Sequence, residues 1–258
     1  MKLNVVEART GSKWVRQGIR VFWKQPIAMS GLFFLFMAIM SLSALLPIVG
    51  SFIALTLLPA ATLGLMAASR EVDLGKFPMP TILAIAFRAN KERKRDMAIL
   101  GLLYALGFVG VMGISALMDG GGFAKLYLVG GKLDAETIMD PNFQNAMWLS
   151  LLLYMPLSMV FWHAPALVHW HGVPALKSLF FSTVACLRNW RAFLVFGLMW
   201  TVVFMSTALI LSLVSGLMGD GELVSMTLLP AMLMLAAMFF CSVYFSFCDC
   251  FVSDTIYA

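Results

Sequence analysis

The sequence predicts an all-α polytopic membrane protein. Six transmembrane helices are expected as three hairpins, each preceded by a cytoplasmic interfacial helix. The chain is 61% hydrophobic and 12% charged, whereas soluble domains carry about 25% charged residues. It also holds six apolar runs of the roughly 20 residues that cross a bilayer, and helices satisfy their own backbone in lipid. The predicted spans are Ile27–Leu46, Ile48–Ala68, Met97–Leu117, Ala146–Val168, Ala192–Leu213 and Met226–Phe247.

We expect one membrane domain over residues 1–258. It begins with an amphipathic segment, 1–26, and continues with hairpins at 27–68, 97–168 and 192–247. The segment 118–145 is the one sizeable loop on the extracytoplasmic side. Its Asp134-Ala-Glu136 stretch is typical of a short helix start.

The basic residues predict the orientation of the chain. Sixteen of the 18 Lys and Arg residues lie in 1–26, 69–96 and 169–191, all on one side of the predicted membrane. Loops rich in Lys and Arg stay in the cytoplasm. Both termini are therefore expected in the cytoplasm. This rule accounts for the net charge of +5, so no nucleic-acid partner is expected.

Residues 8–25 have the pattern of a helix that lies on the membrane surface. An apolar arc that includes Trp14 lies opposite a cationic stripe that includes Arg16, Arg20 and Lys24. Such a helix binds anionic headgroups, and each basic residue contributes about 1 kcal/mol. Residues 174–191 repeat the pattern, while Pro80–Arg95 is less amphipathic. Membrane lipids with anionic headgroups are the expected partners, together with a possible membrane protein complex.

A Pro-Ala pair recurs in the second helix of each hairpin. TLLPA occupies 56–60 and again 227–231, and Ala164-Pro165-Ala166 lies between them. A proline within a helix frees a carbonyl one turn earlier and bends the helix. Pro59, Pro165 and Pro230 therefore either line a central pathway or are simply bends tolerated in membrane helices. The spacing also indicates a threefold repeat.

His163 is the titratable residue deepest in a predicted span. It either lines a pathway or has a packing role. Acidic and basic residues avoid the centres of the six spans. His163, His169 and His171 project in different directions on a helix, and Cys248-Asp-Cys250 has no partner pair. Neither pattern predicts a metal site. No cofactor and no catalytic residue are expected, and no enzymatic activity is predicted.

Two blocks of residues carry a resemblance to a known family. The first block is Gly18, Phe22, Pro26, Leu46-Pro47, Gly50, Pro59, Gly64-Leu65 and Gly75. The second is Trp162 to Val168 followed by Ala175, Ser178, Ser182, Cys186, Asn189 and Trp190. These residues resemble an uncharacterised proteobacterial inner-membrane family with a six-span domain. That family is distantly similar to the membrane domains of glycerophosphodiester phosphodiesterases. The resemblance implies a location and a fold, without an activity.

The function expected from these patterns is a non-enzymatic inner-membrane protein that acts as a lipid-facing or partner-binding scaffold or accessory subunit. The alternative is a facilitative transporter or channel for a small neutral or amphipathic molecule. A polar cavity near Pro59, Pro165 and Pro230 favours transport. A dry, apolar centre favours the scaffold.

Overall fold

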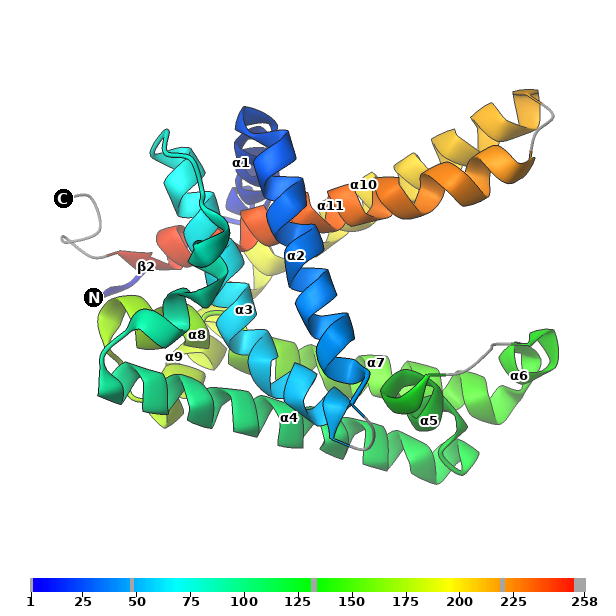
Figure 1. Cartoon of the computed structure of the whole chain (residues 1–258), viewed down its shortest axis with the longest axis horizontal. Coiled ribbons are helices and arrows are strands. Elements are labelled where there is room, and N and C mark those ends of the chain that lie inside the picture. The colour runs from blue at the N-terminus through cyan, green and yellow to red at the C-terminus, as the bar shows by residue number, and fades with distance from the viewer. Residues whose placement is uncertain (1, 47–48, 131–133, 219–220, 253–258) are drawn as a thin grey trace. The chain divides into compact units, whose positions relative to one another are not determined.

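The computed structural model describes residues 2–46, 49–130, 134–218 and 221–252. Pro47, part of the first block that carries the resemblance, lies outside the described residues, as do 131–133 of the 118–145 loop. The chain is almost entirely helical (Figure 1). Its elements are β1 (Lys2–Leu3), α1 (Thr10–Lys24), α2 (Pro26–Ala44), α3 (Gly50–Asp73), the 3₁₀ helix η1 (Pro80–Arg88), α4 (Lys91–Asp119), α5 (Gly122–Val129), α6 (Ala135–Met139), α7 (Pro141–Phe161), α8 (Ala164–His171), α9 (Ala175–Arg188), α10 (Trp190–Met218), α11 (Gly221–Cys250) and β2 (Phe251–Val252).

Six helical segments in the described part of the chain are long and apolar enough to cross a membrane. They are Pro26–Ala44, Gly50–Asp73, Lys91–Asp119, Pro141–His171, Trp190–Leu217 and Met226–Cys250. Each overlaps one of the predicted spans, so the all-α polytopic fold class is confirmed.

The described residues form two compact units. Unit 1 consists of the described residues of Met1–Leu35, Thr62–Ile85 and Val184–Ala258, and unit 2 consists of Phe36–Ala61 and Ala86–Thr183. Helices α2, α3 and α9 each contribute residues to both units. The single domain over 1–258 stays a prediction.

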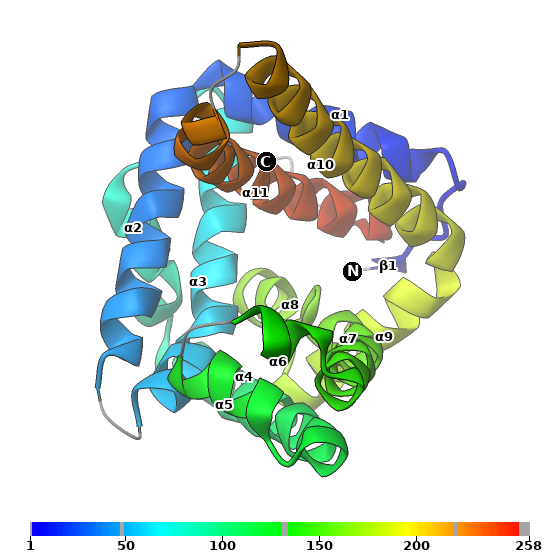
Figure 2. The same cartoon turned by 90° about the vertical axis from the view of Figure 1, so that its right-hand side faces the viewer.

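In unit 1, helix α1 packs against α10 and α11 (Figure 2). Two glycines allow the close approach. Gly11 lies against the Ala192 carbonyl, and a Cβ added to Gly18 would come within 2.5 Å of the Ser242 Cβ. The Trp14 ring lies between these helices, 5.2 Å from the Phe193 ring centroid. The apolar face of α1 is therefore buried in protein.

The two ends of the described chain meet in unit 1. Strands β1 and β2 pair antiparallel, with Leu3 opposite Phe251. The amide of Asn189, between α9 and α10, holds the residues that follow β1. Its Oδ1 accepts from the Val6 amide at 2.8 Å, and its Nδ2 donates to the Asn4 carbonyl at 3.0 Å. Asn189 is 2% exposed, so these bonds replace those that water would supply.

In unit 2, helices α4 and α7 pack along each other, and α5 packs on both. The α3 segment in this unit approaches α4 closely because Gly101 lies against the Thr56 carbonyl. One buried hydrophobic cluster of this unit consists of Phe108, Val111 and Met112 of α4. Asp119 ends α4 and accepts hydrogen bonds from the Gly121 and Phe123 amides, which fixes the start of α5.

The fourth span is broken, where the sequence predicted a continuous helix over Ala146–Val168. Helix α7 ends at Phe161, and α8 begins at Ala164 with Pro165 in its first turn. Pro165 has no amide hydrogen, so it cannot continue the helical ladder. Ser182 of α9 compensates at the break. Its Oγ accepts from the His163 amide at 3.0 Å and donates to the Met159 carbonyl at 2.8 Å.

The segment before the second hairpin also differs in detail. Residues Pro80–Arg88 form the 3₁₀ helix η1 in place of an amphipathic α-helix. Asn90 then caps α4 by accepting a hydrogen bond from the Arg93 amide at 2.9 Å. The basic residues from Lys91 onward extend the spanning helix. Within the 118–145 loop, Asp134 caps the short helix α6, as its sequence indicated.

Candidate functional site

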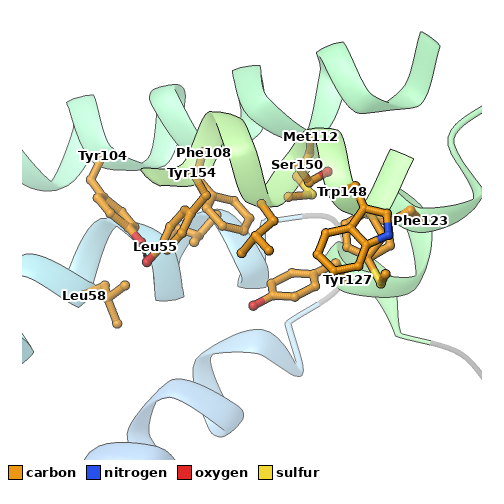
Figure 3. A pocket seen from close by; sticks show the side chains of 12 residues that line it. Leu55, Leu58, Tyr104, Phe108, Met112, Phe123, Tyr127, Trp148, Ser150 and Tyr154 are labelled. Carbon is orange, nitrogen blue, oxygen red and sulfur yellow. Dashed lines mark hydrogen bonds between the residues drawn. The ribbon is translucent and has the colours of Figure 1, made fainter. Parts of the chain in front are cut away.

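Unit 2 contains an aromatic cavity of about 530 Å³ (Figure 3). Side chains from four helices line it. Leu55 and Leu58 come from α3, Tyr104, Phe108 and Met112 from α4, Phe123 and Tyr127 from α5, and Met147, Trp148, Ser150, Leu151 and Tyr154 from α7. We call it the aromatic cavity. Its size and its mainly apolar lining are typical of sites that hold small molecules.

The cavity has a buried wall and an open edge. Tyr104 and Phe108 of α4 are each 5% exposed, whereas Tyr127, Trp148 and Leu151 are at least half exposed. The buried wall forms because α4 packs tightly on α7 and α3 at this level. Tyr127 of α5 and Trp148 and Leu151 of α7 form the open edge.

Aromatic rings pack around the interior. The Phe108 ring centroid lies 5.6 Å from that of Tyr127 and 6.1 Å from that of Tyr154, the latter edge-on. These distances are typical of favourable aromatic pairs. The polar side-chain groups of the lining residues are the hydroxyls of Tyr104, Tyr127, Ser150 and Tyr154 and the indole N–H of Trp148. The Tyr104 and Tyr154 hydroxyl oxygens lie 3.2 Å apart and share a hydrogen bond.

The twelve lining residues contain no carboxylate, histidine, cysteine, lysine or arginine. The lining can therefore solvate a hydrocarbon or an uncharged ring and offer hydroxyl groups to a neutral polar atom. Partial desolvation by the surrounding protein and, second, the nearby Tyr154 hydroxyl raise the pKa of the Tyr127 phenol above its usual value of 10.0. Tyr127 therefore stays neutral at physiological pH.

The predicted lipid-contacting residues divide between buried and exposed positions. Trp14 is 0% exposed, and its Nε1 donates to Asp249 Oδ2 at 2.9 Å. The face of α1 that was expected to enter the headgroups packs against α10 and α11, and the lipid contact of these residues stays a prediction. Arg16 and Arg20 are exposed. Lys24 pairs with Asp73, with 3.1 Å between Nζ and Oδ1.

None of the predicted pathway residues lines the aromatic cavity. Pro59 is buried in α3, beside the lining residue Leu58. Pro165 and His163 are buried at the break between α7 and α8, and the aromatic cavity includes neither. Pro230 lies in α11 of unit 1 and is exposed. The interpretation of these residues as a shared pathway or as separate bends stays a prediction.

In the part of the chain that the structure describes, no three His, Cys, Asp or Glu side chains gather closely enough to hold a metal ion. The four cysteines, which all lie in the described part of the chain, form no disulfide bonds. Of these, Cys186 is buried on α9, and its burial raises the pKa of the thiol to about 12.

The cavity residues were not singled out from the sequence. A search for charged groups within spans passes over Tyr104 and Tyr154, because a phenol is uncharged. The available signal was a tyrosine at the middle of each of two apolar runs, where a hydroxyl needs a partner. Their meeting depends on how α4 and α7 pack, which spacing alone does not give.

The fold and the cavity define a polytopic α-helical membrane protein with a neutral interior site. Comparison with known proteins agrees with this class. The chain is 37% identical over 254 residues to a protein of Burkholderia thailandensis named "Probable inner membrane protein BTH_II0599", covering 97% of this chain and 94% of that protein. The chain therefore belongs to the family of that inner membrane protein.

No family model matches the chain, and no solved structure matches it. The expected distant similarity to glycerophosphodiester phosphodiesterase membrane domains consequently has no support from these comparisons.

Proposed function

We propose that this protein is a non-enzymatic, lipid-binding scaffold of the bacterial inner membrane, and that the aromatic cavity holds an apolar or amphipathic molecule taken from the bilayer. One observation carries the proposal. The cavity in unit 2 is lined by apolar and aromatic side chains and has an open edge at Tyr127, Trp148 and Leu151.

The lining accounts for the choice of ligand. An apolar molecule enters the aromatic cavity at little cost in free energy. A charged group would lose its solvation there without gaining a partner. The absence of carboxylate, histidine, cysteine, lysine and arginine side chains among the twelve lining residues supports binding over catalysis. The exposed Arg16 and Arg20 support a second, electrostatic contact of unit 1 with anionic lipids.

Facilitated transport is the second candidate, favoured by Pro59. A proline at this position cannot donate a hydrogen bond to the Leu55 carbonyl one turn earlier. Leu55 itself lines the aromatic cavity. A locally weakened helix at a cavity wall is a feature that transporters use to move a ligand past a site.

Binding is tested with the purified protein and a cavity-filling variant. Leu55→Phe adds a ring to the cavity wall, and Leu106→Phe is the matched control because Leu106 lies on α4, is 53% exposed and does not line the cavity. Lipids retained by the protein in mild detergent are extracted, then identified and quantified by mass spectrometry. We expect Leu55→Phe to retain less lipid than the parent and than Leu106→Phe. Equal retention by all three proteins contradicts the proposal.

Scaffold and transporter are separated in liposomes. An uncharged glucosylceramide analogue with a fluorescent acyl chain is placed in both leaflets, and its accessibility to dithionite is followed with and without protein. A scaffold leaves transbilayer movement at the protein-free rate. A transporter accelerates it, and Pro59→Ala then changes the accelerated rate.

A further inference from the structure

The Tyr104–Tyr154 pair has a hydrogen-bonding capacity that the protein does not use. Two hydroxyls carry two protons, and the bond between them uses one. Among the described residues neither hydroxyl makes a second hydrogen bond. Tyr104 is 5% exposed and lies near the middle of its span. Water is scarce at that depth, so the second proton needs an acceptor oxygen from another source.

We propose that the ligand of the aromatic cavity is an uncharged amphipathic molecule whose carbonyl or similar acceptor oxygen binds the Tyr104–Tyr154 pair. Its hydrocarbon part extends toward Trp148. This inference rests on the proposed function and adds to it the ligand class and the direction in which the ligand lies.

Charge and shape support this ligand class. A carboxylate or an ammonium group at the tyrosine pair would find no counter-charge among the twelve lining residues, which are all uncharged. A neutral carbonyl oxygen accepts a hydrogen bond from one phenol hydroxyl and needs no counter-charge. The rings of Phe108, Phe123 and Tyr127 then enclose the rest of the molecule, where aliphatic or unsaturated carbon packs well.

The direction follows from where the hydroxyl pair lies along the cavity. Figure 3 shows Tyr104 and Tyr154 toward one end of the lining and Trp148 and Phe123 toward the other. On α7, Trp148 precedes Tyr154 by six residues, about 9 Å along a helix axis. A chain of eight carbons has a comparable length. A ligand with its oxygen at the pair therefore places its far end beside the Trp148 indole.

Two isomeric neutral esters test the direction. Methyl 8-bromooctanoate and methyl 2-bromooctanoate differ in whether bromine lies at the far end or next to the ester. Bromine quenches tryptophan fluorescence on contact. The signal of Trp148 is isolated by subtracting the Trp148→Phe variant, which removes the contribution of the chain's other tryptophans. Because Trp148 is 61% exposed, quenching by ester dissolved in detergent is measured with Leu55→Phe, whose cavity is filled, and is subtracted as well.

We expect the 8-bromo ester to quench Trp148 more strongly than the 2-bromo ester. Stronger quenching by the 2-bromo isomer, or equal quenching by both, overturns the inferred direction while lipid binding in the cavity survives. Failure of both isomers to quench Trp148 overturns the inference and the proposed function together.

Two further measurements test the class of the ligand. The 8-bromooctanoate anion should bind more weakly than the ester, and tight binding of the anion would overturn the assignment of an uncharged ligand. Tyr104→Phe combined with Tyr154→Phe should weaken ester binding about three- to tenfold, the effect of losing one ordinary hydrogen bond. Unchanged ester affinity in a double variant that keeps its helical circular dichroism would overturn the role of the hydroxyls.

Discussion

The indole Nε1 of Trp14 donates a 2.9 Å hydrogen bond to Oδ2 of Asp249, which joins α1 to the last turn of α11 across 235 residues of sequence. Lys13, next to Trp14, also reaches that carboxylate, with 3.4 Å between Nζ and Oδ2. An amphipathic helix that was expected to rest on the lipid surface is thus anchored within unit 1.

Replacing Trp14 should destabilise unit 1. Trp14→Phe keeps much of the ring but leaves Asp249 without its indole donor, and hydrogen bonds to charged groups contribute about 1.5–3 kcal/mol. We expect the free energy of unfolding in mixed micelles to fall by about that amount. Trp23→Phe is the control, because Trp23 on the same helix is 59% exposed, and its effect should stay below about 0.5 kcal/mol. Similar losses for the two variants would contradict the anchoring role of Trp14.

A single methyl group at Gly18 should also loosen α1. A Cβ there would come within 2.7 Å of the Ser242 backbone nitrogen, which a side-chain rotation cannot relieve. Overpacking of this kind costs about 1–3 kcal/mol, so Gly18→Ala should lower the melting temperature. Gly31→Ala in α2 is the matched control. A Cβ there meets nothing within 4 Å, and alanine is the better helix former. A melting temperature for Gly18→Ala equal to that of Gly31→Ala would argue against the close packing.

The Cys186 thiol should react slowly in the folded protein. Its pKa is raised by burial from the usual 9.0 to about 12. Because the folded state holds this proton more tightly, the thiol contributes stability that is fully present below pH 9 and is lost as pH rises toward 12. Maleimide labelling at about pH 8, read by mass spectrometry of the Cys186 peptide, should be slow in mild detergent. It should become fast when a denaturing detergent unfolds the chain. Leu187→Cys places a thiol at a position that is 57% exposed and should label fast. Equal rates at both positions would show that Cys186 is accessible.

The exposed arginines of α1 should sense anionic lipid. Arg16→Glu with Arg20→Glu reverses two charges without breaking the Lys24–Asp73 pair. Each basic residue near an anionic leaflet contributes about 1 kcal/mol. Thermal unfolding in nanodiscs should show that phosphatidylglycerol stabilises the parent more than the double variant. Lys125→Glu in α5 is the control and should be stabilised by phosphatidylglycerol as much as the parent. Equal stabilisation of the double variant, the control and the parent would contradict the electrostatic contact.

Both termini are predicted to lie in the cytoplasm. A cysteine at exposed Lys125 in the 118–145 loop should react with a membrane-impermeant maleimide added to intact spheroplasts. A cysteine at exposed Lys94 should react only after lysis. The opposite pattern would invert the orientation.

Local patterns predicted most of the helices. The apolar runs are long and separated by charged or glycine-rich segments, so the spans overlap the predictions, with shifts at their ends. Asp134 and Thr10–Lys24 were likewise readable, because capping and amphipathicity depend on neighbouring residues. The break at Pro165 was not predicted, since a proline inside an apolar run reads equally well as a bend.

Which surface each face meets was less predictable. The wheel of α1 separates its apolar and cationic sides, yet hydrophobicity does not distinguish lipid from the apolar flank of another helix. Gly11 and Gly18 were the sequence features that allowed α10 and α11 to approach. Their significance depends on which residues of another helix face them, and the sequence pattern of α1 does not show that.

The sequence by itself determined the membrane class and the approximate positions of six spanning helices, because crossing a bilayer requires length and apolarity that composition records directly. Only the tertiary structure decided that Trp14 is buried and that Tyr104 meets Tyr154 across two helices. In lipid every apolar side chain is equally at home against a neighbour or a bilayer. The choice between them is made by close packing and by hydrogen bonds between residues far apart in the chain.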